Sequence, residues 1–329
     1  MNCELEHKIF SANPSNFDEL ALEVFEFQYQ NNLLYRTYVD TLYTHKPSLK
    51  LAKDIPFLPI QFFKSHSIVS GSFEPELCFE SSGTTGANTS RHFVKKAALY
   101  ETSFFTCFEQ FYGSVENWCV IGLLPSYLER KASSLVYMVE AMIKKSKHPK
   151  SGFYLYEHEK LAQVLSDLEA KGQPVLLFGV TFGLLDFAEK YQLPLKHTVI
   201  METGGMKGRR TEMTRTQVHE ELVAAFQTNA IHSEYGMTEL LSQGYSKGDG
   251  VFHAAPWMRI AVREEEDPLS VKMNEKASGV INVIDLANLY SCSFIATDDA
   301  GRIHPDGSFE VLGRIDHSDV RGCSLMIAE

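Results

Sequence analysis

The feature that most constrains the fold is an alternation of apolar runs with helix-like segments in the middle of the chain. Short apolar runs occupy residues 118–123, 175–178 and 197–201. Between and after them, composition and spacing predict helices over about 133–145, 184–191 and 211–226, the last one capped by Thr211. Buried strands that alternate with helices form mostly parallel sheets with helices packed against them. The sequence therefore predicts an α/β fold with a mixed, mostly parallel sheet and flanking helices.

The two outer parts of the chain carry other patterns. From Phe17 to Leu42, apolar residues recur at helical spacing, which predicts one or two amphipathic helices. After about Trp257, short β-type runs are separated by turn signals such as Asp306-Gly307, and the runs occupy residues 259–262, 280–284, 294–297 and 309–312. We therefore expect a smaller antiparallel β subdomain over about residues 257–312.

Composition and charge exclude several classes of protein. Of the 329 residues, 44% are hydrophobic and 22% are charged, as in globular proteins rather than in disordered chains or coiled coils. A net charge of −11 without any stripe of Lys and Arg argues against a nucleic-acid partner. Neither a signal peptide nor an apolar run of membrane-spanning length is present. Six cysteines without a C-x-x-C pair predict reduced thiols and a cytoplasmic protein.

A polar, glycine-rich segment is the first candidate for chemistry. It reads Ser81-Ser82-Gly83-Thr84-Thr85-Gly86. The glycines allow the backbone to curl, and the hydroxyl and amide groups suit a triphosphate. The ending of a Walker A loop is missing, and a flexible surface loop is the alternative. Arg91 and His92 follow and are candidates for cationic contacts to phosphate, or else exposed polar residues.

The second candidate follows a β-type run at residues 230–232. It reads Ser233-Glu234-Tyr235-Gly236-Met237-Thr238-Glu239. Ligands of open α/β sheets bind at the carboxyl ends of the strands. A carboxylate beside a hydroxyl, here Glu239 and Thr238, suits Mg²⁺ together with a phosphate oxygen. The alternative is the start of a helix that Thr238 caps.

The third candidate joins two segments near the end of the sequence. They read Thr297-Asp298-Asp299-Ala300-Gly301-Arg302 and Leu312-Gly313-Arg314-Ile315-Asp316. A carboxylate in a tight turn accepts hydrogen bonds from both hydroxyls of a ribose, and an arginine reaches the same sugar or its phosphate. The alternative is a plain turn without a ligand.

Together these motifs resemble the acyl-adenylate-forming superfamily in their order and approximate spacing. The resemblance implies that the hydroxyl-rich loop Ser81 to Gly86 and Thr238 contact ATP phosphates, and that Glu239 contacts Mg²⁺. It also implies an adenine and ribose site, to which the matching positions are Thr203, Gly204, Gly205, Tyr235, Gly236, Asp299 and Arg314. The cofactors expected from it are ATP and Mg²⁺.

Two departures from the superfamily pattern are informative. The phosphate loop usually ends in Pro-Lys, so Arg91 would supply the cation here. The sequence ends soon after Arg314, where the superfamily continues into a mobile C-terminal domain that carries a catalytic lysine. That absence argues against an ordinary CoA ligase. Lys207, in the basic run 207–210, is a second candidate for neutralising charge, with a solvated loop as the alternative.

A narrower resemblance accounts for the early end. The segments that carry it are 58–64, 80–92, 124–130, 203–209 and 321–325. They resemble the acyl-protein synthetases of bacterial luminescence operons, the LuxE type. This implies that the chain activates a fatty acid with ATP, moves the acyl group to its own cysteine and passes it to an acyl reductase partner.

The matching cysteine is Cys323, beside Arg321, which would lower the pKa of the thiol. A small packing role is the alternative for Cys323. The implied organisation is an adenylating domain over residues 1–312 and a hinge with a C-terminal arm over 313–329. Rival functions are a ligase that transfers the acyl group to CoA or a carrier-protein thiol, and a non-catalytic nucleotide-binding subunit of a reductase complex. The acyl chain and the oligomeric state are not encoded in these patterns.

Overall fold

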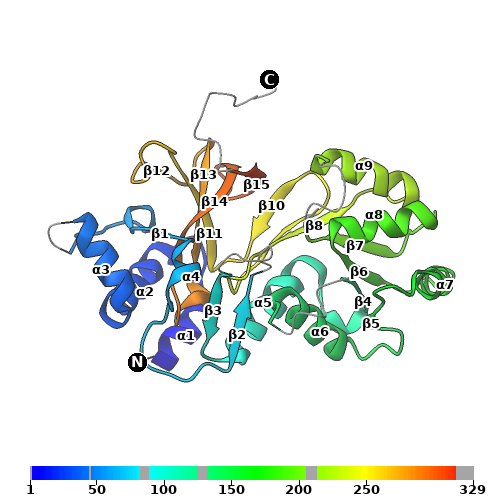
Figure 1. Ribbon diagram of the computed structural model, residues 1–329, viewed down its shortest axis with the longest axis horizontal. Coiled ribbons are helices and arrows are strands. Elements are labelled where there is room, and N and C mark those ends of the chain that lie inside the picture. Colours follow the sequence, from blue (N-terminus) through cyan, green and yellow to red (C-terminus); the bar gives the residue numbers. More distant parts are fainter. Residues whose placement is uncertain (1, 44–45, 82–88, 125–131, 205–212, 316–329) are drawn as a thin grey trace.

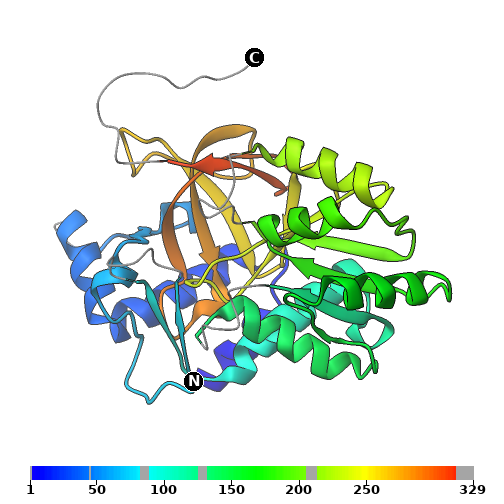
Figure 2. The same ribbon diagram turned by 45° about the vertical axis from the view of Figure 1, so that its right-hand side comes forward.

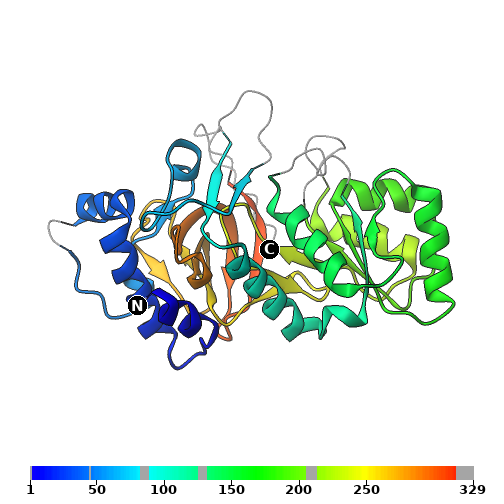
Figure 3. The ribbon, with the colours of Figure 1, turned by 90° about the horizontal axis from the view of Figure 1, so that it is seen from below.

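The computed structural model describes residues 2–43, 46–81, 89–124, 132–204 and 213–315, which form two lobes (Figure 1). The parallel lobe contains strands β4–β8 and helices α5–α9, and the antiparallel lobe contains strands β10–β15 and helices α1–α4. A two-stranded hairpin, β2–β3, forms a separate sheet. Figure 3 shows this hairpin between the two lobes.

Parallel strands form the centre of the first lobe. In spatial order they are β8 (His232–Tyr235), β7 (Thr198–Glu202), β6 (Val175–Gly179), β4 (Cys119–Leu123) and β5 (Gly152–Phe153). The helices are α5 (Ala97–Tyr112), α6 (Ser134–Ser146), α7 (His158–Glu169), α8 (Thr181–Lys190) and α9 (Arg215–Phe226). A short 3-10 helix, η2 (Val115–Asn117), precedes β4.

Helices cover both faces of this sheet, which explains the continuous apolar runs in the sequence. Val120 and Leu176 belong to a core cluster that includes residues of α5 and α6. Their neighbours Ile121 and Leu177 belong to a second cluster with residues of α7, α8 and α9. Successive strand residues point to opposite faces, so strands packed on both faces are buried throughout. The predicted α/β fold class is confirmed.

The antiparallel strands are hydrogen-bonded to the parallel ones through β8 and β9. The path runs β8-β9-β10-β15-β14-β13-β11-β12, and β1 pairs with β14 in parallel. Their bounds are β1 (Leu58–Pro59), β9 (Gly244–Ser246), β10 (Val251–Ala254), β11 (Met258–Arg263), β12 (Val271–Lys272), β13 (Ala277–Asp285), β14 (Phe294–Ile303) and β15 (Phe309–Arg314). The 3-10 helix η3 (Leu286–Asn288) follows β13. Figure 2 shows the long strands β13 and β14 beside β11.

The N-terminal helices pack on the antiparallel strands. They are α1 (Asn2–Phe10), α2 (Phe17–Asn31) and α3 (Leu33–Leu42), followed by η1 (Ala52–Asp54) and α4 (Phe62–Ser65). Asn32 separates α2 from α3 because it adopts an extended conformation and its side chain accepts a hydrogen bond from Tyr35 N. Gln28 of α2 is buried and donates to the backbone oxygens of Asn288 and Leu289. None of the helices in these ranges is long and apolar enough to cross a membrane.

Two predicted boundaries were wrong. Helix α9 begins after Thr214 rather than Thr211, because Thr214 and Gln217 form a capping box: each side chain accepts a hydrogen bond from the other residue's backbone amide. The predicted turn at Asp298-Asp299 is instead the middle of strand β14, which continues to Ile303 across a β-bulge. Pairing with both β13 and β15 therefore overrides the local turn signal.

Candidate active site

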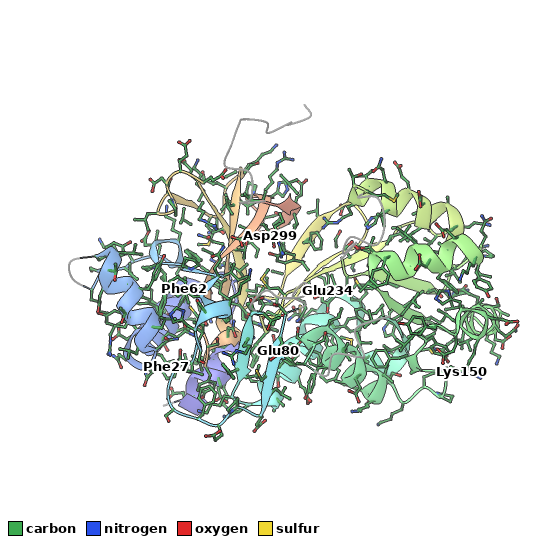
Figure 4. All side chains as sticks on the ribbon, in the orientation of Figure 1. Phe27, Phe62, Glu80, Lys150, Glu234 and Asp299 are labelled. Atoms are coloured by element: carbon green, nitrogen blue, oxygen red, sulfur yellow. The ribbon has the colours of Figure 1, made fainter. Side chains whose placement is uncertain are left out.

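The candidate residues come from strand ends and turns of both lobes. Tyr235 and Glu202 end the parallel strands β8 and β7, while Asp299 lies on β14 in the antiparallel lobe. In Figure 4, Asp299, Glu234 and Glu80 lie in the middle of the molecule, where the lobes and the hairpin meet. The carboxyl ends of parallel strands are the usual ligand site of such sheets.

Asp299, Tyr235 and Arg314 form one group. The Tyr235 hydroxyl donates a hydrogen bond to Asp299 Oδ2 at 3.0 Å. Arg314, opposite Asp299 in the β14–β15 register, places Nε 3.5 Å from Asp299 Oδ1. Burial and the Asp299 charge raise the pKa of Tyr235 well above its usual value, so its hydroxyl remains a donor. Asp299 is nearly buried while the Arg314 side chain is 77% exposed, so the arginine is accessible to a ligand.

Glu239 is the second group, and it links the turn after β8 to the base of the hairpin. The residue is only 5% exposed, and burial raises the pKa of its carboxyl group. The Ser90 side chain and the charges of Arg314 and Lys64 stabilise its ionised form. Lys64 is an exposed residue of α4 that sequence reasoning did not include in the site.

Two buried side chains hold the backbone around Glu239. Nδ1 of His92 donates to the carbonyl oxygen of Thr238 at 2.8 Å, and Nδ2 of Asn288 donates to the carbonyl oxygen of Glu239 at 2.7 Å. Burial lowers the pKa of His92 to about 4, so the ring is neutral. The prediction of a cationic His92 contact to phosphate was therefore wrong. Residues 236–240 form a turn rather than a helix, which excludes Thr238 as a helix cap.

The hydroxyl-rich segment lies in the sequence between β2 (Leu77–Glu80) and β3 (Arg91–Val94), which pair as a hairpin. Ser81 N donates to Ser90 O at 3.0 Å, and Ser90 N donates to Ser81 Oγ at 2.9 Å, so these residues close the base of the loop. Arg91 is exposed at the start of β3, with its guanidinium 5.8 Å from the Phe93 ring centre. Eight residues of the predicted sites lie outside the described residues, as does Arg321; they are Ser82, Gly83, Thr84, Thr85, Gly86, Gly205, Lys207 and Cys323.

The segment after β7 is held by a carboxylate that sequence reasoning missed. Thr203 donates its backbone N–H to Gly179 O at 3.0 Å, and Gly204 has φ +74°, which favours glycine. Gly204 N donates to Oε1 of the buried Glu202 at 2.7 Å. Burial alone would raise the pKa of Glu202, but the nearby His219, the hydrogen bond from the Thr181 hydroxyl and the charge of Arg215 lower it. Glu202 therefore stays ionised.

Glu234 was part of the predicted motif, but no role was assigned to it. Some of its surface remains accessible, yet many protein atoms surround its carboxyl group. This burial, together with the negative charge of Glu202, raises the pKa of Glu234 to about 8. On β8, Glu234 shares a face with His232, whose Nδ1 lies 3.0 Å from the Tyr112 hydroxyl of α5, so it lies on the α5 side of the sheet. Glu202, the last residue of β7, and Glu234, the next-to-last residue of β8, thus have opposite pKa shifts on neighbouring strands.

The carboxylate and other polar side chains of the site indicate what kind of metal ion it could bind. Among the described residues, no group of three or more His, Cys, Asp or Glu side chains is arranged to hold a metal ion. Glu239 is a buried carboxylate that has the Ser90 side chain and the positive charges of Arg314 and Lys64 nearby. Such a donor set fits a cation that brings most of its ligands with it, as Mg²⁺ does with water and phosphates.

Solved structures of other proteins share the fold of this chain. MatB from Rhodopseudomonas palustris with bound ATP is 16% identical, with a TM-score of 0.54 over 74% of this chain and 49% of MatB. A 2-hydroxyisobutyryl-CoA ligase in its postadenylation state is 11% identical, with a TM-score of 0.60 over 92% of this chain and 69% of the ligase. The chain thus spans about half the length of MatB. These identities establish a shared fold.

The sequence itself matches one family over nearly its whole length. No curated protein sequence matches it. The family described as "Acyl-protein synthetase, LuxE" matches residues 5–329, which confirms the resemblance drawn from the motifs. The protein therefore belongs to the LuxE family of acyl-protein synthetases.

Proposed function

We propose that this protein activates a carboxylic acid with ATP and then transfers the acyl group to its own Cys323. In the first step a carboxylate oxygen of the acid attacks the α-phosphorus of ATP, and pyrophosphate leaves. In the second step the Cys323 thiolate attacks the acyl carbonyl carbon, AMP leaves, and the thiol proton passes to solvent. A fatty acid is the proposed substrate class, and an acyl reductase is the proposed partner.

The observation that carries the proposal is the convergence of three motifs that are far apart in the sequence. The hairpin, the turn after β8 and the β14–β15 pair meet through the His92–Thr238 and Tyr235–Asp299 hydrogen bonds. A site that binds a nucleoside triphosphate needs three parts: a hydroxyl-rich loop for the phosphates, a carboxylate for the metal ion and a carboxylate for the ribose. The meeting of Glu239, Asp299 and the hairpin that flanks the loop supports an ATP site rather than three unrelated segments.

Each group has a distinct task in the proposed site. Asp299, held by Tyr235, would accept hydrogen bonds from the ribose hydroxyls. Glu239 would hold Mg²⁺, which supplies charge neutralisation for the phosphates when bound. Arg314 and Lys64, whose charges already act on Glu239, and the exposed Arg91 would stabilise the negative charge that develops on phosphate oxygens. Lys207 is a further proposed cation.

Four of the other five cysteines support the choice of Cys323 by contrast. Burial raises the pKa of Cys119 to about 11 and that of Cys292 to about 12, and it also raises the pKa of Cys107 and Cys78. A thiol must ionise to attack the acyl-adenylate, so these four are poor nucleophiles near neutral pH. Arg321, two positions from Cys323 in the sequence, would favour its thiolate.

The proposal is tested in two half-reactions. The purified protein is incubated with ATP, Mg²⁺ and a panel of alkyl and aryl acids, and acid-dependent pyrophosphate exchange is measured. Intact-mass spectrometry then detects an acyl adduct that hydroxylamine removes. Cys323→Ala is expected to keep the exchange and lose the adduct, while Cys292→Ala is the matched control that keeps both.

Each alternative gives a different result. Exchange with release of an acyl thioester only when CoA or a carrier-protein thiol is added would favour a ligase with an external acceptor. ATP binding without exchange for any acid would favour a non-catalytic subunit. An adduct that persists in Cys323→Ala would place the acceptor on another residue.

A further inference from the structure

We propose that Glu202 is a positioning residue that holds the Thr203–Gly204 segment in the conformation that binds nucleotide. The inference rests on the proposed function, because that segment leads into the expected adenine site. Glu202 itself lies at the buried end of β7 and is not expected to touch ATP. Its contribution would come through the backbone that it orients.

The Oε1 atom of Glu202 joins strand β7, the segment that follows it and helix α8. It accepts hydrogen bonds from Gly204 N, at 2.7 Å, and from the Thr181 hydroxyl. Thr181 begins α8, and its backbone N–H in turn points to Gly204 O at 3.5 Å. One carboxylate oxygen therefore fixes the position of Gly204 relative to the first turn of α8.

The Oε2 atom extends the same network toward β8. It lies 4.0 Å from Nε2 of His219 on α9, and that nitrogen lies 3.4 Å from Ser233 Oγ. Ser233 is two residues before Tyr235, the tyrosine that binds Asp299. The network thus spans both strand ends that carry the proposed adenine and ribose residues.

Because the ionised carboxylate of Glu202 is buried, its hydrogen bonds are needed to stabilise it. An ionised carboxylate in the protein interior is unfavourable unless hydrogen bonds and opposite charges compensate it. Here a backbone amide, a hydroxyl and His219 do so, and the amide belongs to a glycine with positive φ. Without the carboxylate, Gly204 N would lose its acceptor and the segment would gain other conformations.

The chain provides a matched control at the opposite end of the same strand. Glu169 accepts hydrogen bonds from Lys196 N at 2.9 Å, from His197 N at 3.0 Å and from Thr198 Oγ1 at 2.6 Å. It is also a carboxylate that binds backbone amides and a threonine hydroxyl beside β7. It differs in lying at the amino end of the strand, away from the proposed nucleotide site.

The experiment compares ATP binding by the full chain and its variants. Isothermal calorimetry with ATP gives Kd, and pyrophosphate exchange gives KM for ATP and kcat. Glu202→Ala should raise Kd and KM about tenfold, as expected for a lost hydrogen bond to a charged group, with a smaller change in kcat. Glu202→Gln keeps an oxygen acceptor and should recover most of the binding. Glu169→Ala should leave Kd unchanged.

The outcomes separate this inference from the proposed function. Equal Kd values for Glu202→Ala and the unaltered chain, or equal losses in Glu202→Ala and Glu169→Ala, would overturn the positioning role. If Glu202→Ala does not fold, Thr181→Val removes one donor to the same oxygen and should raise Kd about threefold. ATP binding without acid-dependent exchange would refute the proposed function alone, while the Kd comparison would still decide the role of Glu202.

Discussion

Replacement of Glu234 by glutamine should make the protein more stable at alkaline pH. The folded-state pKa of Glu234 is about 8, against 4.5 for an unperturbed carboxyl group. Between these values the unfolded chain releases a proton that the folded chain retains. Stability from this group is therefore complete below about pH 4.5 and is lost as the pH rises toward 8. Glutamine mimics the neutral carboxyl and removes this dependence.

The size of the effect follows from the two pKa values. Each unit of pKa difference corresponds to about 1.4 kcal/mol. Raising the pH from 5 to 8 crosses most of the interval from 4.5 to about 8 that separates the two states. The unfolding free energy of the unaltered protein should fall by about 3 kcal/mol more than that of Glu234→Gln over this change in pH.

Urea denaturation at pH 5 and pH 8 measures this difference. The fully buried Trp257 provides a fluorescence signal for unfolding. The exposed Glu266→Gln is the control, and its unfolding free energy should follow that of the unaltered protein within about 0.5 kcal/mol at both pH values. Equal pH dependence in Glu234→Gln and the unaltered protein would refute the argument that burial and Glu202 keep Glu234 protonated.

Three further predictions concern the proposed ATP site. Glu239→Gln should lower acid-dependent pyrophosphate exchange about 100-fold, because a charged group that acts on the transition state is lost; near-normal exchange would remove Glu239 from the metal site. Asp299→Ala should raise the Kd for ATP about tenfold in calorimetry. The control Asp298→Ala loses the hydrogen bond from Gln61 Nε2 and should change the Kd little. If Asp298→Ala instead raises the Kd and Asp299→Ala does not, the ribose assignment shifts by one residue. Lys64→Ala should lower the kcat of exchange about tenfold with little change in protein stability, and an unchanged kcat would exclude a role for this cation.

The fold could be predicted where burial leaves a direct signal in the sequence. Strands packed on both faces, such as β4 and β6, are apolar at every position, so their runs stand out. Helices α5 and α7 were not predicted; α5 is rich in aromatic residues on several sides. The extent of β14 depends on its partners β13 and β15, which local sequence does not specify.

The sequence predicted several residues of the site but not the contacts between them. The motifs identified Tyr235, Glu239 and Asp299, but only the tertiary structure brings Tyr235 and Asp299, 64 residues apart, into hydrogen-bond contact. Glu202 gave no signal because it ends an ordinary apolar strand. Its function as an acceptor depends on Thr181 and on the backbone of Gly204, which no spacing reveals.

The hydrogen bonds between Gln28 and the segment that joins β13 to β14 have a consequence for biosynthesis. The Gln28 side chain reaches Ser293, 265 residues later in the sequence. A ribosome therefore releases helix α2 long before the strands that cover its apolar side are made, and contacts of such long range also form slowly. The nascent chain would expose Phe17, Val24 and Phe25 during this interval. Chaperones that bind exposed apolar segments should thus associate with the N-terminal part of the chain until β14 has been synthesised.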